Sequence, residues 1–246
     1  MEDLYIGKLI EKGSFGKVYK GRYNDQMVAV KKINKATLTK YKLDPRIEID
    51  ILNQLDNTLV VKLLDFLEDK KSVYHVLEYA PRDLFNVIVN ETISEKQALK
   101  YIKSITRGLL YLNSINIAHL DIKPENILIT FYNKTKITDF GHARLIEPGK
   151  MFDRHGGTIF YLAPEIVRRE PYDNTVDIWS LGIMYYEMLA KKPVFFADKE
   201  ADVYDLIMKN EPQIPETISL VTGFNILQIL SVNRPSFADI LNFKWH

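Results

Sequence analysis

The strongest constraint on the fold is a change in hydrophobic period close to residue 80. Before it, short apolar runs end at Gly, Asn or Asp, a pattern typical of strands joined by tight turns. After it, apolar residues recur at helical spacing. The sequence therefore predicts a small antiparallel sheet followed by a larger and mostly helical part. The predicted strands span 5–10, 17–20, 27–30, 60–66 and 73–77.

One helix is predicted to interrupt the strand-rich part, because Pro45 suits the first turn of a helix and apolar residues follow it at helical spacing. Those apolar residues are Ile47, Ile51, Leu52 and Leu55. The stretch 79–82, which contains Pro81, is predicted to be a hinge. Beyond it, helices are predicted at 98–113, 175–189, 201–209, 224–230 and 237–243.

Composition narrows the class of protein. The 33 basic and 32 acidic side chains nearly cancel, so the chain as a whole has no charge that would draw it to nucleic acid or to an anionic membrane. The absence of cysteine excludes disulfides, thiolate zinc sites and cysteine nucleophiles. Neither a signal peptide nor a membrane span is found, since the most apolar stretch, 178–190, is short and contains Glu187. We expect an intracellular protein, cytoplasmic or nuclear or both.

The segment His119-Leu120-Asp121-Ile122-Lys123-Pro124-Glu125-Asn126 carries the clearest chemical signal. Asp139-Phe140-Gly141 follows, with Asp139 thirteen residues after Asn126. Asn126 and Asp139 offer oxygen ligands for a metal, beside a carboxylate at Asp121 and a cation at Lys123. That set suits the transfer of a phosphoryl group from a metal-bound nucleotide.

Two features of the strand-rich part point to the same chemistry. Gly13-Ser14-Phe15-Gly16 lies in a turn between strands, where backbone amides can approach phosphates, although Glu11 stands where a further glycine is usual. Such a turn is more often a hairpin without a ligand. Lys31 ends the run Val28-Ala29-Val30 and can pair with Glu48 on the predicted helix.

Taken together, these motifs resemble a eukaryotic-type protein kinase, and the resemblance runs from Leu9 to Arg234. In its compactness the chain also resembles kinases of large DNA viruses, including the baculovirus protein kinases. The matching elements, in the order of the family, are Gly13–Val18, Val28–Lys31, Glu48, Glu78–Ala80, His119–Asn126, Asp139–Gly141, Ala163–Glu165, Asp177–Gly182 and Arg234.

The resemblance implies an α+β, two-lobed fold. The N-terminal lobe, 1–78, would hold a small antiparallel sheet and one main helix, and the mostly helical C-terminal lobe, 83–246, would follow the hinge 79–82. Leu52, Leu63, His119 and Phe140 match the apolar stack that joins the lobes of active kinases. Glu165 and Arg234 match a buried ion pair.

The resemblance also implies roles for single residues. Asp121 would orient the substrate hydroxyl, Lys123 would neutralise charge on the transferred phosphoryl group, and Thr158 would brace both. Lys31, paired with Glu48, would be positioned on the phosphates. Asn126 and Asp139 would hold Mg²⁺, with ATP as the nucleotide. The residues implied to contact ATP are Ile10, Gly13, Ser14, Phe15, Gly16, Val18, Ala29, Lys31, Leu77, Glu78, Ala80, Asp83 and Leu128.

Lys123 resembles the serine/threonine kinases, so a protein substrate with a serine or threonine hydroxyl is implied. Asp83 and Glu125 match acidic positions that contact arginines in basophilic relatives, which favours a basic substrate. The simpler alternative is that Asp83 serves only the ribose and Glu125 only its loop. No direct binding to nucleic acid or to membranes is expected, and the oligomeric state stays open.

The chain departs from the family at Leu120, where many kinases have an arginine that holds a phosphate on the activation segment. Residues 142–157 contain no serine, threonine or tyrosine. We therefore expect activity that does not require phosphorylation of this segment. The alternative function, suggested by Glu11 and Leu120, is a pseudokinase scaffold that binds nucleotide or partners. A small-molecule kinase is a more remote alternative.

Overall fold

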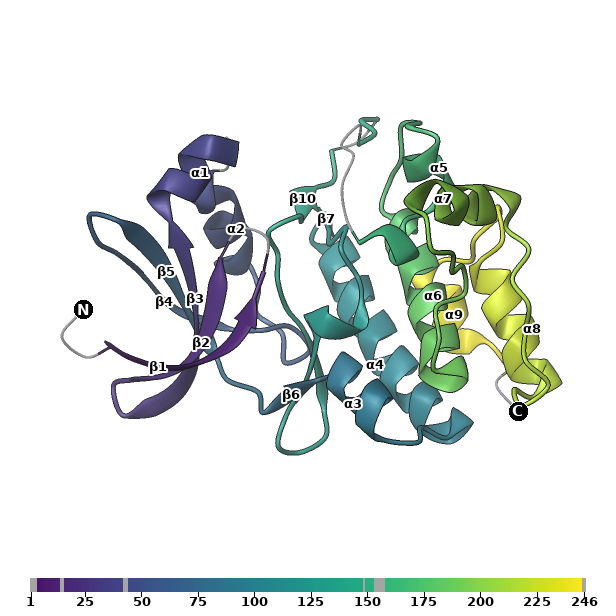
Figure 1. Ribbon diagram of the computed structural model, residues 1–246, viewed down its shortest axis with the longest axis horizontal. Coiled ribbons are helices and arrows are strands. Elements are labelled where there is room, and N and C mark those ends of the chain that lie inside the picture. Colours follow the sequence, from purple (N-terminus) through teal and green to yellow (C-terminus); the bar gives the residue numbers. More distant parts are fainter. Residues whose placement is uncertain (1–3, 14–15, 42–43, 148, 153–157, 245–246) are drawn as a thin grey trace.

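The structure, a computed structural model, describes residues 4–13, 16–41, 44–147, 149–152 and 158–244. A twisted sheet with two short helices forms one side of the molecule, and a larger helical part forms the other (Figure 1). This arrangement confirms the predicted α+β class. The boundaries proposed for the two lobes and for the hinge stay a prediction.

Five strands form the antiparallel sheet of the first part, in the spatial order β1-β2-β3-β5-β4. All five runs predicted from the sequence fall on these strands, although residues 60–62 precede the fourth one and Val60 instead bridges to Ile137. The strands are β1 (Leu4–Lys12), β2 (Lys17–Tyr23), β3 (Gln26–Asn34), β4 (Leu63–Glu68) and β5 (Ser72–Glu78).

The predicted helix after residue 44 is α2 (Pro45–Leu52). Pro45 occupies its first turn, and the carboxylate of Asp44 caps it by accepting the N–H of Arg46 at 2.9 Å. A second short helix, α1 (Lys35–Tyr41), was not predicted from the sequence; it buries Leu38 in a small apolar cluster beside the sheet. One seven-residue helix with a single buried side chain leaves little periodic signal.

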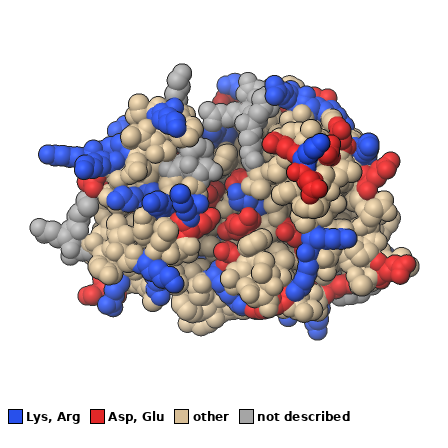
Figure 2. All heavy atoms as spheres, viewed as in Figure 1, with Lys and Arg blue, Asp and Glu red and all other residues tan. Residues whose placement is uncertain are grey.

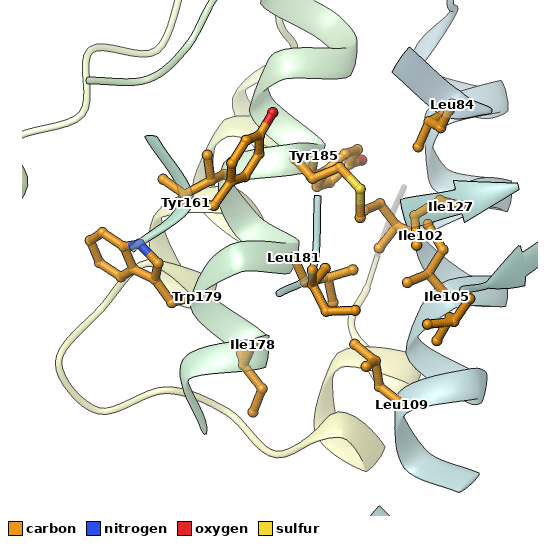
Figure 3. Close-up of a cluster of buried hydrophobic side chains, with 14 of the residues drawn as sticks. Leu84, Ile102, Ile105, Leu109, Ile127, Tyr161, Ile178, Trp179, Leu181 and Tyr185 are labelled. Atoms are coloured by element: carbon orange, nitrogen blue, oxygen red, sulfur yellow. The ribbon is translucent and has the colours of Figure 1, made fainter. Parts of the chain in front are cut away.

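The helical part is built around α6 (Thr175–Ala190), which lies in the core beside the long α4 (Glu95–Ser114). Leu181 and Tyr185 of α6 are almost completely buried, and Figure 3 shows them facing Ile102, Ile105 and Leu109 of α4. The remaining helices are α3 (Leu84–Asn90), α5 (Pro164–Val167), α7 (Glu200–Lys209), α8 (Leu220–Ile229) and α9 (Phe237–Asn242).

Short strands and turns, all but β6 between α4 and α6, carry many of the motif residues. They pair as two small sheets, β10 with β7 and β6-β8-β9. These elements are β6 (Arg82–Asp83), β7 (Ile117–Ala118), the 3-10 turn η1 (Pro124–Asn126), β8 (Ile127–Ile129), β9 (Thr135–Ile137), β10 (Arg144–Leu145) and the 3-10 turn η2 (Ile159–Tyr161).

A single apolar cluster joins the two sides of the molecule. It includes Leu52 of α2 and Phe140, with Leu63 packed against it. The ring of Phe140 meets the edge of the His119 ring with 5.0 Å between centroids, and both residues are fully buried. The four residues expected to form an inter-lobe stack therefore lie in or against one core.

Among the residues described, no helix combines the length and the hydrophobicity that a membrane crossing requires.

Candidate active site

The centre of the site is a group of charges around Lys31. Its ammonium donates to both carboxylate oxygens of Glu48, at 2.7 and 2.9 Å, and to Oδ1 of Asp139 at 2.8 Å. Burial alone would lower the pKa of Lys31, but the carboxylates of Asp139 and Glu48 outweigh it and raise that pKa. Burial acts to raise the pKa of both carboxyls, yet the Lys31 charge holds both below their ordinary values. All three side chains are therefore ionised at neutral pH.

Sheet register brings Lys31 to this position. It lies directly across from Val18 on β2 and from His75 on β5, and directly opposed residues of antiparallel strands project from the same face. Glu48 lies in the first turn of α2, which packs on that face of the sheet through Ile51 and Leu52. The predicted Lys31–Glu48 pair is thus formed in the structure.

Asp177 of α6 fixes the backbone just before Asp121. Its two carboxylate oxygens accept the N–H groups of His119 and Leu120, each at 2.8 Å. Leu120 has φ 65°, in the left-handed region that costs a non-glycine residue on the order of 1–2 kcal/mol. Two hydrogen bonds to a buried carboxylate offset that cost. The sequence motif contained Asp177, but no role in the site was predicted for it.

His119 supports the same turn through its ring. Nδ1 accepts the N–H of Asp121 at 3.3 Å, which makes Nε2 the protonated nitrogen and allows it to donate to the carbonyl of Thr138 at 3.0 Å. The ring therefore links the segment that carries Asp121 to the segment just before Asp139.

Asp121, Lys123, Asn126 and Thr158 meet in one connected group. Oδ2 of Asp121 contacts Nζ of Lys123 and accepts a hydrogen bond from Nδ2 of Asn126, both at 2.9 Å. Lys123 also donates to the hydroxyl of Thr158 at 2.9 Å. Within the described part of the chain, Oδ1 of Asp121 accepts no hydrogen bond. One oxygen of a buried carboxylate is thus available to a substrate hydroxyl.

The donor set fits a hard divalent cation. Because Asn126 uses Nδ2 to bind the carbonyl and carboxylate of Asp121, its amide oxygen remains as a ligand beside the carboxylate of Asp139. Among the described residues, no group of three or more His, Cys, Asp or Glu side chains could hold a metal by itself. Two oxygen ligands suit Mg²⁺, which usually keeps waters and binds substrate phosphates as well.

The glycine-rich turn between β1 and β2 is closed by a hydrogen bond from the N–H of Gly13 to the carbonyl of Gly16, at 3.0 Å. A Cβ on Gly16 would lie 2.8 Å from the carbonyl oxygen of Lys32, so close packing on β3 requires glycine there. The predicted ATP contacts Ser14 and Phe15 lie outside the described residues.

Glu11, the departure from the glycine pattern, pairs with Val18 across β1 and β2 and so shares a face with Lys31. Burial raises the pKa of its carboxyl, and the charges of Asp139 and Asp83 raise it further. Glu11 therefore faces the acidic side of the site.

Register also groups the residues expected around a nucleotide base. Ala29 lies directly across from Leu77 on β5, while Asp83 lies across from Leu128 on β8. The carboxylate of Asp83 caps α3 by accepting the N–H of Asn86 at 2.7 Å. Three other residues predicted to contact the nucleotide lie nearby in the chain or the sheet. Ile10 is exposed, and Ala80 is half-buried in the connection between β5 and β6. The side chain of Glu78 binds Lys136 at 2.8 Å. The N–H of Glu78 donates to the carbonyl of Lys62 at 3.0 Å, so neither its N–H nor its side chain is available to a base.

Acidic side chains border the site. Figure 2 shows Asp and Glu gathered near the middle of the face that it presents. Burial raises the pKa of Glu125, with further increases from Asp121 and Asp83, and its buried Oε2 has no hydrogen-bond partner among the described residues. Glu187 of α6, which was not predicted as a site residue, is 8% exposed and accepts a hydrogen bond from Tyr161. Its pKa is raised by burial and by Glu125. Its isolation in an apolar helix was the signal available in the sequence.

Glu165 and Arg234 form the predicted ion pair. Nη2 of Arg234 donates to Oε2 of Glu165 at 2.8 Å, and its guanidinium lies 5.2 Å from the ring centroid of Trp179. The arginine side chain is 7% exposed and the glutamate side chain 20% exposed. This pair anchors the start of α5, just after the segment that carries Thr158.

Comparison with known proteins agrees with this geometry. Residues 5–245 match the family described as the protein kinase domain. The chain is 38% identical to an Aurora kinase of Yarrowia lipolytica over all of its own length and 68% of that protein. It is 37% identical to the serine/threonine-protein kinase TIO of Arabidopsis thaliana, over 89% of this chain. It is 36% identical to serine/threonine-protein kinase 36 of Mus musculus, over 98% of this chain.

The chain spans only 17% of the TIO kinase and 19% of the mouse kinase. The similarity to these two proteins therefore concerns one region of each.

Proposed function

The chain belongs to the serine/threonine protein kinase family, and from this we propose that it transfers the γ-phosphoryl group of Mg-ATP to serine or threonine hydroxyls of proteins. One observation carries the proposal. The Lys31–Glu48–Asp139 group and the Asp121–Lys123–Asn126–Thr158 group are both complete, and their charges are paired. In this family the protein contributes mainly positioning and charge neutralisation.

In the proposed reaction, Oδ1 of Asp121 accepts the hydrogen bond of the substrate hydroxyl and orients its oxygen. Lys123, held between Asp121 and Thr158, neutralises charge that develops on the transferred group. Lys31 binds nucleotide phosphates while Glu48 holds its ammonium in place. These roles rest on the distances between the side chains and on the family.

Nucleotide binding is proposed for the face that Val18, Ala29 and Leu77 share, with the backbone of Glu78 and Ala80 at the base and Asp83 at the ribose. Gly13 and Gly16 would approach the phosphates through the backbone, and Ile10 and Leu128 would cover the base. Asn126 and Asp139 would hold Mg²⁺, which supplies charge neutralisation at the phosphates when bound.

Removal of the metal tests the proposal. The wild-type chain is expected to transfer labelled phosphate from ATP to a serine-containing peptide in the presence of Mg²⁺, and chelation should abolish transfer because Lys31 alone cannot neutralise the triphosphate. Re-addition of Mg²⁺ should restore it. A pseudokinase scaffold would show no transfer in either condition, and that result would refute the proposal.

We further propose that activity does not depend on phosphorylation of the segment 142–157. Leu120 lines a cavity of about 430 Å³ together with Ile47 of α2 and with Leu145 and Met151 of that segment. An apolar side chain here cannot bind a phosphate, although Arg144 contributes one guanidinium to the same cavity. The lack of a hydroxyl in 142–157 supports the same conclusion.

Phosphate-free protein, verified by intact mass, is expected to phosphorylate a peptide from the first turnover without a lag. Treatment with upstream kinases should leave its specific activity unchanged, since no acceptor lies in the segment. The measurement is a progress curve with and without such treatment. A chain that stays inert until it is phosphorylated would contradict this proposal. Whether the chain transfers phosphate at all would still be decided by the metal-dependence test.

For the substrate we propose a protein with basic residues near the acceptor. Glu125 is half-buried and Glu187 is buried, and the charge of Glu125 raises the pKa of Glu187. The unpartnered Oε2 of Glu125 suits a cationic hydrogen-bond donor. Asp83 adds a third carboxylate. An arginine side chain would satisfy these groups and relieve their mutual repulsion.

Glu125→Gln and Glu187→Gln are each expected to raise the KM for an arginine-containing peptide about tenfold, which corresponds to ~1.4 kcal/mol of lost ion pairing. The KM for the same peptide with alanine in place of arginine should not change. Glu216→Gln, at an exposed site, is the matched control. Equal effects on both peptides would contradict a role in substrate choice.

The same preference should depend on pH. Burial raises the pKa of both Glu125 and Glu187 above the ordinary value of 4.5, and a bound cation favours their ionised forms. On acidification toward about pH 5 these carboxyls gain protons earlier than exposed glutamates do. The KM for the arginine peptide should therefore rise as pH falls, while the KM for the alanine peptide should stay constant.

A further inference from the structure

We propose that His75 is a positioning residue for Glu48, and that its imidazole N–H holds the Glu48 carboxylate in the orientation that Lys31 requires. The inference rests on the proposed function, because it assigns a partner to the residue that positions Lys31. His75 would not touch substrate or nucleotide.

His75 lies at the middle of β5, in the strand next to the one that carries Lys31. Its backbone position is directly across from Lys31 on one side and from Phe66 of β4 on the other. The three side chains therefore project from one face of the sheet, the face on which α2 packs. The ring of His75 lies 5.7 Å from that of Phe66 between centroids, and the histidine is 0% exposed.

Both ring nitrogens are buried and have no hydrogen-bond partner among the described residues. Buried polar atoms in folded proteins nearly always have one, and a leucine or methionine would fill this site without that cost. The neighbouring core positions of β5, Val73 and Leu77, are indeed apolar. An imidazole with two unpartnered nitrogens therefore calls for a polar group within its reach.

Glu48 is that group. Nδ1 of His75 lies 3.7 Å from Oε2 of Glu48, longer than a hydrogen bond by about half an ångström or more. The charged groups that face the ring are Glu48 from α2 and Lys31 from β3, with Asp139 bonded to Lys31, while β4 presents the ring of Phe66. A small rotation of either side chain closes the distance. An N–H on Nδ1 then donates to a carboxylate that is already held below its ordinary pKa by Lys31 and by His75 itself.

This contact matters because both carboxylate oxygens of Glu48 accept hydrogen bonds from Lys31, at 2.7 and 2.9 Å. When Lys31 directs hydrogens to phosphates, one of those oxygens loses a donor in a buried site. The His75 N–H supplies a replacement, so the carboxylate keeps its place and continues to hold the lysine. An apolar residue at position 75 would leave that oxygen unsatisfied.

The test compares His75→Leu with His75→Gln, whose amide retains an N–H donor. We expect His75→Leu to lower kcat about tenfold and His75→Gln to stay within about threefold of the wild-type chain, because loss of one hydrogen bond to a charged group has an effect of that order. The KM for peptide should not change in either. His75→Met serves if the leucine variant does not fold, and Phe66→Leu controls for altered packing around the ring.

A double-mutant cycle with Glu48→Gln separates positioning from simple packing. If His75 acts through Glu48, His75→Leu should change kcat by less than about twofold in the Glu48→Gln background. A tenfold loss that persists in that background, or equal losses for the leucine and glutamine variants, would overturn the inference.

The wild-type chain in the same assay distinguishes failure of the proposed function from failure of the role proposed for His75. If that chain does not transfer phosphate, the dissociation constant for a non-hydrolysable Mg-ATP analogue replaces kcat as the measured quantity. His75→Leu should then weaken binding while His75→Gln restores it. Unchanged affinity in all variants would refute the role of His75 whether or not the chain is an active kinase.

Discussion

The Asp121→Asn variant is expected to transfer phosphoryl groups about 10³-fold more slowly than the wild-type chain, the effect typical of losing a positioned proton acceptor. Asparagine keeps the size of the side chain and an oxygen that can accept from Asn126, but it carries no charge for Lys123 and cannot take up a proton. The KM for ATP should stay within about twofold, because Asp121 lies apart from the face proposed to bind the base.

Steady-state kinetics at saturating Mg-ATP measure this difference, and thermal unfolding shows that the variant is folded. Asp56→Asn, at an exposed position, is the matched control and should behave as the wild-type chain. An Asp121→Asn variant that retained full transfer would mean that the phosphate in the assay came from a contaminating kinase or that the chemistry lies elsewhere. A scaffold would keep its binding function in this variant, whereas an enzyme loses its function.

The second large effect is on stability. Glu165→Ala is expected to lower the free energy of unfolding by about 3 kcal/mol, since it leaves the Arg234 guanidinium buried without its carboxylate. Arg234 is 7% exposed at its side chain, lies over the ring of Trp179 and already has a buried Nε without a hydrogen-bond partner among the described residues. The expected loss reflects the burial of the guanidinium, which is far less exposed than the glutamate side chain.

Denaturant unfolding monitored by tryptophan fluorescence measures the change, because Trp179 adjoins the pair. Glu170→Ala is the control: its contact with Arg168 is 3.8 Å long and both side chains are about half-exposed, so it should cost less than about 0.5 kcal/mol. The double variant Glu165→Ala with Arg234→Ala should be less destabilised than the sum of the single variants, because no buried charge remains. Equal losses for Glu165→Ala and Glu170→Ala would show that burial of the pair contributes nothing.

Much of the fold follows from local patterns in the sequence. Alternation in the first 78 residues predicts the strands, and Pro45 predicts where α2 begins. Each of these signals is read from neighbours in the chain, because side-chain period depends on the local backbone. The short helix α1 was missed because only Leu38 among its seven residues is buried.

The candidate site likewise has residues that the sequence predicts and residues that it does not. The residues of the motifs could be identified by type and spacing, and the structure brings Lys31, Glu48 and Asp139 into contact although Lys31 and Asp139 are 108 positions apart. Glu187 and His75 could not be assigned, since their relations to Glu125 and to Glu48 join elements that are distant in the chain. Sequence spacing carries no information about such contacts.

Leu120 shows most clearly which properties follow from side-chain type and which depend on tertiary contacts. That Leu120 cannot bind phosphate, and that residues 142–157 offer no hydroxyl, follows from side-chain chemistry alone. The backbone φ of 65° at Leu120, and its place in a cavity beside α2, depend on tertiary contacts. Asp177, 57 residues away, supplies the hydrogen bond that stabilises this backbone. Side-chain type is encoded locally, whereas a strained backbone persists only where distant groups satisfy it.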